Sequence, residues 1–291
     1  MSQAAKRVVL LACLLGGGFL LPALLAPWGA PHDPYELDLA LSLAPPTIES
    51  PLGRDEQGAD ILSRLLYGAR ISLLVGVGTV AISALLGIAV GLVAGHAGGW
   101  LEQILMRMVD VLLAFPGLLL AIALVAVLGP GVGNVVIALS ALGWTGFARL
   151  VRGQVLEVKE RDFIQAARAL GVGHGRMMLR HILPNIAAPV VVQASFAVAG
   201  AILSEASLSF LGLGAPPGTP SWGAMLADGK HVLLEAPHVS LSPGLAIMGV
   251  VLGFNLLGDA LNDWLDPRRR PAPGSLPRST VARGAGRARR P

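Results

Sequence analysis

The sequence predicts an all-α integral membrane protein with about six transmembrane helices. Of its 291 residues, 54% are hydrophobic and only 14% are charged, whereas a typical soluble domain is about a quarter charged. A bilayer core of ~30 Å needs roughly 20 apolar helical residues to cross it. Six stretches reach that length: Val8–Trp28, Ile71–Ala94, Ile104–Leu128, Val132–Leu150, Ala188–Leu213 and Leu241–Leu261.

The first stretch has two interpretations. It follows Lys6 and Arg7, so a cleaved signal peptide is an alternative to a retained helix. The apolar run continues to Ala26 and is longer than the roughly 7–15 residues of a signal-peptide core. We therefore expect a retained helix. Cys13 lies within it and, as the chain's single cysteine, excludes an intrachain disulfide.

The distribution of basic residues predicts that both termini are cytoplasmic. If Lys6 and Arg7 lie in the cytoplasm, six spans put residues 149–180 and the C-terminal tail on the same side. Those two segments hold most of the Arg and Lys, whereas the opposite side holds acids such as Asp33 and Glu56. This is the positive-inside pattern of membrane proteins. The net charge of +4 therefore reflects orientation, and no basic stripe with interleaved aromatics suggests a nucleic-acid partner.

The chain divides into four parts. Residues 1–28 hold the first helix, and residues 29–70 form an extracytoplasmic segment that is Pro-rich and then helical from Asp60. Residues 71–265 form the membrane core, with five helices and a cytoplasmic loop at 152–187. Residues 266–291 are a tail rich in Arg and Pro, a composition that predicts disorder.

Small residues and one proline shape the predicted membrane helices. Gly87, Gly91 and Gly95 recur every four residues, which is typical of a close helix-packing face. The alternative is that Gly is simply common in membrane helices. Pro116 should kink the third helix.

Polar residues within the apolar stretches are candidates for function. Glu205 stands inside a span, so it contacts either the translocation path or a neighbouring helix through a structural hydrogen bond. Arg107 and Asp110 should form an i, i+3 pair. The histidines, among them His96 and His174, are isolated in the sequence, and we predict no metal site and no cofactor.

The cytoplasmic loop carries a first short helix. Asp162 followed by Gln165 resembles a capping box and predicts a helix that begins there. Gly171 is placed for a left-handed cap at the helix end. The helix should present an apolar face made of Ile164, Ala166, Ala167 and Leu170.

A second short helix should run from His174 to Leu183 and end at Pro184. Asn185 should then cap the next membrane helix. From periodicity alone, this helix–elbow–helix either packs on its own bundle, lies on the membrane surface or docks on a partner protein.

The pattern Gln165-Ala166-Ala167, then Gly171, then Ile182-Leu183-Pro184 resembles the "EAA" loop of ABC importer permeases. Gln165 departs from the usual Glu of that family. In the family this loop is the coupling helix, which inserts into a groove on the cytoplasmic ATPase. The resemblance therefore implies an ATPase-coupling loop formed by Asp162, Gln165, Ala166, Ala167, Gly171, Ile182, Leu183 and Pro184.

The resemblance extends over nearly the whole chain. Residues 51–73 look like the segment before the second helix in permeases of the dipeptide, oligopeptide and nickel type, although Arg54 and Ala59 depart from that pattern. Residues 205–214 and 220–223 resemble a later signature of the same subfamily. These matches imply the C-type permease subunit of a type I ABC importer, a binding-protein-dependent permease of the bacterial inner membrane.

The resemblance also implies partners. They are a second permease subunit, two cytoplasmic ABC ATPase subunits or domains, and an extracytoplasmic substrate-binding protein. The chain contains no G-x-x-x-x-G-K-[ST] motif, so it has no phosphate-binding loop of its own. We therefore expect a transport subunit and not an enzyme, with ATP hydrolysed by the partner subunits.

Two other functions remain open at this point. A secondary transporter or channel would typically show paired intramembrane charges and internal repeats, and the chain offers little beyond Glu205. A membrane scaffold without transport is the second. Within the importer interpretation, no residue decides between dipeptides, oligopeptides, nickel chelates and related solutes.

Overall fold

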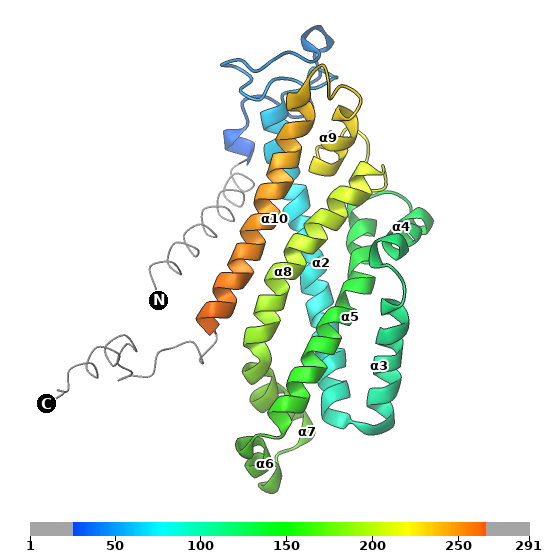
Figure 1. Cartoon of the computed structure of the whole chain (residues 1–291), viewed down its shortest axis with the longest axis vertical. Helices are drawn as coiled ribbons and strands as arrows, with labels where there is room; N and C mark the ends of the chain where they lie inside the picture. Colours follow the sequence, from blue (N-terminus) through cyan, green and yellow to red (C-terminus); the bar gives the residue numbers. More distant parts are fainter. Residues whose placement is uncertain (1–25, 266–291) are drawn as a thin grey trace, which may run out of the picture.

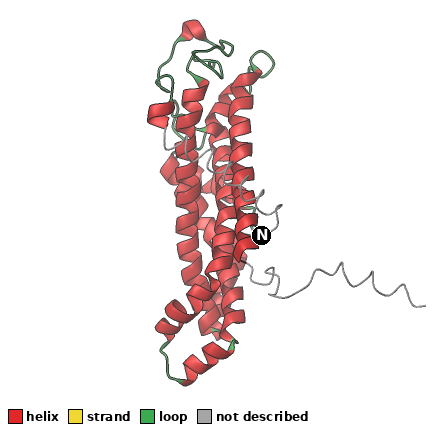
Figure 2. Cartoon of the chain, turned by 90° about the vertical axis from the view of Figure 1, so that its left-hand side faces the viewer, coloured by secondary structure: helices red, strands yellow, loops and turns green. Residues whose placement is uncertain are grey.

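Helices make up nearly all the regular structure of residues 26–265, which are the residues that the computed structural model describes (Figure 2). Within this range the extended structure is limited to one isolated bridge between Arg54 and Asp60. The elements are a 3-10 turn η1 (Leu39–Leu41), α2 (Ile61–Ala97), α3 (Gly99–Leu113), α4 (Gly117–Leu128), α5 (Val132–Lys159), α6 (Asp162–Ala169), α7 (His174–Arg176), a π-helical turn η2 (Met177–Ile182), α8 (Leu183–Phe210), α9 (Trp222–Gly229) and α10 (Pro237–Leu265). The all-α prediction is confirmed.

The described residues contain four helices that are long and apolar enough to cross a membrane alone. They are α2, α5, α10 and the continuous helix His174–Phe210, which includes α8. The pair α3 and α4 forms a fifth span if the two are counted together. The last five of the six predicted stretches therefore correspond to observed helices. Most of the first stretch, Val8–Trp28, lies outside the described residues.

The span formed by α3 and α4 is sharply broken. The two helices meet at an angle of 85°, so α4 runs crosswise to α3 at the side of the bundle instead of continuing it (Figure 1). Pro116 lies at the break with an extended backbone and precedes the first residue of α4. Its ring removes a backbone N–H and clashes with a preceding helical turn. The predicted kink is confirmed.

The long helices run between two ends of the molecule (Figure 1). We call the end formed by residues 30–60 and 211–236 the α9 end, and the opposite end, formed by residues 159–183, the α6 end. At the α9 end, the Asp60 side chain accepts hydrogen bonds from the backbone N–H of Ser63 at 2.8 Å and from its hydroxyl at 2.7 Å. This N-cap starts α2, and the predicted helix from Asp60 is continuous with the membrane span.

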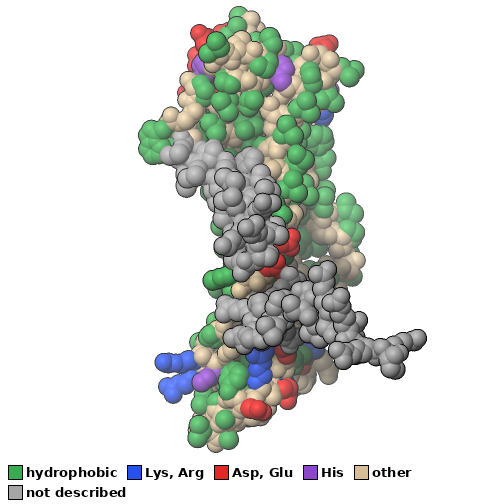
Figure 3. All heavy atoms as spheres, turned by 60° about the vertical axis from the view of Figure 1, so that its left-hand side comes forward, with side chains coloured by type: hydrophobic (Ala, Val, Ile, Leu, Met, Phe, Trp, Pro, Cys, Tyr) green, Lys and Arg blue, Asp and Glu red, His purple; other side chains and the backbone are tan. Residues whose placement is uncertain are grey.

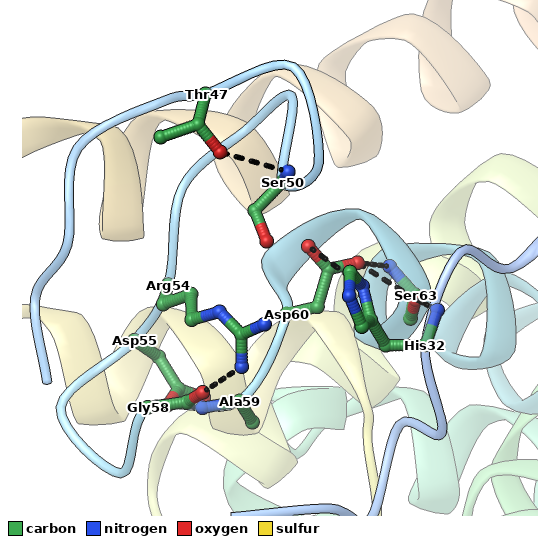
Figure 4. A network of polar contacts seen from close by, with 9 residues as sticks. All are labelled: His32, Thr47, Ser50, Arg54, Asp55, Gly58, Ala59, Asp60 and Ser63. Carbon is green, nitrogen blue, oxygen red and sulfur yellow. Dashed lines mark hydrogen bonds and ion pairs between the residues drawn. The ribbon is translucent and has the colours of Figure 1, made fainter. Parts of the chain in front are cut away.

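A polar network orders the segment before α2 (Figure 4). Asp55 accepts the backbone N–H of Ala59 at 3.0 Å and forms a buried ion pair with Arg64. Arg54 donates to the carbonyl oxygen of Gly58 at 2.9 Å. Trp222 of α9 donates its indole N–H to the carbonyl oxygen of Leu65 at 2.9 Å, which fastens α9 to the start of α2. The two signature segments noted in the sequence are therefore in contact.

The packing of α2 on α5 depends on glycine. A Cβ atom at Gly87 would lie 2.5 Å from the carbonyl oxygen of Trp144, and one at Gly91 would lie 2.7 Å from that of Ala148. At Gly95 the added atom would lie 2.7 Å from the Cβ of Val155. Real Cβ atoms do not approach so closely, so the three glycines let the backbones of α2 and α5 meet. The predicted close-packing face is confirmed.

Hydrogen bonds between polar side chains join the helices elsewhere. The Glu205 carboxylate on α8 is buried and accepts the hydroxyl of Ser72 on α2 at 3.0 Å and that of Ser209 at 2.7 Å. Asp110 on α3 pairs with Arg149 on α5 at 2.7 Å. The predicted pair of Asp110 with Arg107 is wrong, because the antiparallel α5 brings a guanidinium closer to the carboxylate than the adjacent helical turn does.

Replacing Gly91 with Ala should destabilise the protein, because the new methyl group overlaps the α5 backbone. Overpacking of this kind costs about 1–3 kcal/mol. Gly78→Ala on the same helix is the matched control, since no atom lies within 4 Å of its added Cβ. Thermal unfolding of the detergent-purified variants measures both. Equal melting temperatures for the two variants would show that α2 and α5 are not in this register.

Candidate functional site: the loop at the α6 end

The loop between α5 and α8 begins with α6, which starts at Asp162 as predicted. The capping mechanism differs from the prediction. Arg161 occupies the N-cap position and makes no side-chain cap bond, and Asp162 is the first helical residue. The Gln165 amide donates to the carbonyl oxygen of Lys159 at 3.0 Å. The prediction that Asp162 is the N-cap of a capping box is therefore wrong, because the N-cap is one residue earlier. Gln165 instead ties α6 to the last residue of α5.

The end of α6 is a Schellman motif. Gly171 has φ = +78°, a left-handed conformation that side chains disfavour. The N–H of Gly171 donates to the carbonyl oxygen of Arg168 at 3.0 Å, and the N–H of Val172 donates to that of Ala167 at 3.2 Å. The prediction of a left-handed cap at Gly171 is confirmed.

The predicted end of the second helix at Pro184 is wrong. α7 passes through the π-helical turn η2 directly into α8, so His174–Phe210 is one continuous helix. In η2 the N–H of Leu183 donates to the carbonyl oxygen of Met178, five residues back. Pro184 follows directly after η2, where i→i−5 hydrogen bonds already replace the ordinary i→i−4 bonds, so the helix continues past a residue that has no N–H.

Asn185 likewise does not cap a helix. Its side-chain amide lies inside α8 and donates to the carbonyl oxygen of His181 at 2.6 Å. It therefore satisfies one carbonyl in the turn that Pro184 disturbs, and the chain needs no new helix start there.

The apolar residues of α6 point in two directions. Ile164 and Ala167 are buried and belong to the cluster that contains Val158, Met177 and Ile182. They hold the loop against the ends of α5 and η2. Other apolar residues of the loop face outward, and these are Phe163, Ala166, Leu170 and Leu179. The sequence predicted a single apolar face on α6, but the structure has two. The inner face packs against the bundle, and the outer face is not covered by any of the described residues.

Two contacts attach the loop to α2, and the sequence did not reveal them. Nε2 of His96 lies 2.8 Å from Nδ1 of His174, a hydrogen bond in which one ring donates to the other. Lys159 donates to the carbonyl oxygen of Gly95 at 3.3 Å. The prediction that these histidines are isolated is wrong, because residues far apart in the sequence meet where α2 ends beside α7.

Charged side chains surround the loop, and the exposed basic ones outnumber the exposed acidic ones. On the face shown in Figure 3, Lys and Arg side chains gather mainly towards the α6 end. Arg168, Arg176 and Arg180 are exposed there. The outer apolar residues therefore lie among charged side chains at one end of the bundle, where the exposed acids Glu157, Glu160 and Asp162 accompany the arginines.

The structure brings the candidate coupling residues together within this one loop. Of them, Asp162, Gln165, Ala166, Gly171 and Pro184 are exposed, Leu183 is half-buried, and Ala167 and Ile182 are buried. Glu205 lies apart from them, in the contact between α8 and α2. Its place in the translocation path stays a prediction.

Comparison with known proteins identifies the class of molecule. Residues 87–271 match the family described as binding-protein-dependent transport system inner membrane component. This chain belongs to that family. The matched region includes the glycine contact between α2 and α5, the whole loop at the α6 end, α8 and α10.

Several permease proteins of known transport systems are similar to this chain over most of its length. The dipeptide transport system permease protein DppC of Alkalihalophilus pseudofirmus is 42% identical over 265 residues, covering 91% of this chain and 87% of that protein. The di/tripeptide transport system permease protein DppC of Pseudomonas aeruginosa is 46% identical and covers 86% of this chain and 84% of its own. The glutathione transport system permease protein GsiD of Escherichia coli is 48% identical, with coverages of 84% and 82%.

The chain is thus a multi-pass membrane permease subunit of an ABC importer and not an enzyme. As a binding-protein-dependent permease, it works with an ATPase and a substrate-binding protein. This assignment sets aside the secondary transporter and the scaffold.

Replacing Gly171 with Ala should loosen the loop of the permease. An alanine in the left-handed conformation costs about 1–2 kcal/mol, which should speed local opening of residues 162–176 roughly fivefold or more. Hydrogen exchange of the loop amides measures this opening. Gly173→Ala is the matched control, since its φ is −66° and no atom lies within 4 Å of its added Cβ. Unchanged exchange in Gly171→Ala would contradict the Schellman assignment.

Proposed function

We propose that this permease is one half of the translocation path of an ATP-driven importer for short peptides, and that the loop at the α6 end couples it to the ATPase. The supporting observation is the outer apolar surface of α6, made of Phe163, Ala166 and Leu170. Exposed apolar groups rimmed by polar and charged residues are typical of protein-binding sites. The loop is held rigidly by its inner face, so a partner that moves α6 also moves α8.

The orientation follows from charge. The basic α6 end lies in the cytoplasm and the α9 end lies outside, in keeping with the positive-inside rule. Both termini are then cytoplasmic. In this orientation the ATPase reaches α6, and the substrate-binding protein reaches residues 30–60 and 211–236.

The partner permease and the cargo are inferred from relatives. Those relatives are named for transport of dipeptides, di/tripeptides and glutathione. We assign short peptides as the class of cargo here. A second, related permease subunit completes the path, and ATP-driven closure of two ATPases switches the pair between outward- and inward-facing states.

The candidate coupling residues fall into two roles. Asp162, Gln165, Ala166 and Gly171 are exposed and lie on or beside the docking surface. Ala167 and Ile182 are buried and hold α6 in place. A bulky residue at Ala167 would therefore disrupt the loop itself, so a test of docking should change an exposed residue.

Leu170→Glu should weaken ATPase binding. Leu170 is 84% exposed and makes little contact with its own chain, so folding should be unaffected. Placing a charge at the centre of an apolar docking surface costs about 2 kcal/mol or more, which is roughly thirtyfold in affinity. Co-purification of the tagged permease with its ATPases, followed by a binding titration, measures this loss.

Leu234→Glu is the matched control, because Leu234 is 99% exposed but lies at the α9 end. It should bind the ATPases as the wild type does. Retention of the ATPases by Leu170→Glu would exclude α6 as the docking element. If Leu234→Glu also lost the ATPases, the loss in Leu170→Glu would reflect general damage to the complex and not the removal of a docking contact on α6.

A further inference from the structure

A cavity of about 290 Å³ lies in the membrane part of the permease. Its wall comes from four helices and includes Thr79, Ser83, Gly117, Leu118, Gly143 and Ser204. Thr79 is the central residue of α2, which spans Ile61–Ala97, so the cavity lies beside the middle of this helix. The volume is comparable with the smallest ligand pockets, which hold roughly 300 Å³.

The first turn of α4 borders this cavity. Gly117 and Leu118 are its first two residues, and Pro116 before them offers no side-chain cap. The N–H groups of Gly117, Leu118 and Leu119 therefore have no hydrogen-bond partner within residues 26–265, and the first N–H that is bonded is that of Leu120, to the carbonyl oxygen of Pro116. The start of a helix carries roughly half a positive charge. Because α3 and α4 meet at an angle of 85°, this helix start lies in the cavity wall beside the middle of α2 and not within a continuous span.

Two hydroxyl groups in the same wall also lack partners. Thr79 is 4% exposed and Ser83 is 2% exposed, and neither hydroxyl oxygen has a hydrogen bond within the described residues. Leaving a buried hydroxyl unpaired is unfavourable unless a ligand or water satisfies it. These two side chains are one helical turn apart on α2, so both face the same side of the helix.

The cavity wall carries no fixed charge. Its twelve lining residues include no Asp, Glu, Lys or Arg. Ser204 lines the cavity, but the neighbouring Glu205 directs its carboxylate to Ser72 and Ser209 instead. An entering anion would meet hydrogen-bond donors and a helix start, with no carboxylate in the lining to repel it.

We propose that the start of α4, together with Thr79 and Ser83, binds the carboxylate of a peptide as it passes through the permease; this rests on the proposed import of peptides. The backbone N–H groups of Gly117 and Leu118 and the two hydroxyls donate to the carboxylate oxygens. Broken helices at mid-membrane serve anionic groups in this way in other transporters. The site favours a free carboxylate over its neutral amide, which presents one oxygen fewer and an extra donor.

The hydroxyls can be removed without harm to the fold. Because neither has a partner, the double variant Thr79→Val, Ser83→Ala should assemble normally and melt at the same or a higher temperature. Ser195→Ala is the matched control. Ser195 is a buried serine on α8 whose hydroxyl bonds to the carbonyl oxygen of Val191 in its own helix, and it does not line the cavity.

The test is import by the complete transporter in proteoliposomes. Dialanine and dialanine amide are each supplied already bound to the substrate-binding protein at saturating concentration, so the delivery step is matched. The wild type should import dialanine at least tenfold faster than the amide. The double variant should lose roughly tenfold or more of its dialanine import and keep its amide import, because each lost bond to a charged group is worth about a factor of ten. Ser195→Ala should behave as the wild type does.

Other results overturn the inference. The carboxylate site is excluded if the double variant imports both peptides at the wild-type rates. It is also excluded if both rates fall by the same factor, which indicates a structural effect. A wild type that imports the amide as fast as dialanine also excludes it. If the wild type imports neither peptide although the binding protein stimulates its ATPase, the proposed peptide cargo fails and the carboxylate site fails with it.

Discussion

The close contact between α2 and α5 is the constraint on which the rest of the structure depends. Gly87, Gly91 and Gly95 give α5 a path along α2 that no side chain obstructs. Since there is no hydrophobic drive between helices in lipid, close packing of this kind, together with hydrogen bonds between helices, holds the bundle together. It fixes the position of Lys159 beside Gly95, and so the place where the loop leaves the bundle.

The loop at the α6 end is held by α5 and α2 but continues into α8. Its inner residues, Ile164 and Ala167, pack on the bundle, while its cap at Gly171 ends α6 sharply enough to leave Leu170 outside. Within this short helix, the buried residues therefore fix α6 on the bundle while the exposed residues remain available to a partner. Beside the middle of α2 the break at Pro116 has a comparable effect, because it exposes a helix start that an unbroken span would hide.

The sequence predicted the features that depend on local patterns. Hydropathy located the spans, the spacing of Gly87, Gly91 and Gly95 predicted their packing, and Gly171 and Pro116 predicted a cap and a kink. It did not predict contacts between distant segments: His96 meets His174 across 78 positions, and Asp110 meets Arg149 across 39. Pro184 misled because the π-helical turn before it lets the helix continue through a residue that has no N–H. The sequence could not show that the hydroxyls of Thr79 and Ser83 lack hydrogen-bond partners, since serines and threonines in helices often donate to a carbonyl oxygen of their own helix.

The unbroken helix His174–Phe210 makes the permease a lever. Its 37 residues span roughly 55 Å at about 1.5 Å each. One arm ends in the loop and the other lies beside α9, with the Glu205 contact to α2 near the outer end. A tilt of only about 5° about one end would swing the other by roughly 5 Å on this length. Because the Glu205 contact lies near the outer end, a push at the loop acts on the long arm of the helix, and the short outer arm moves by less than the loop does.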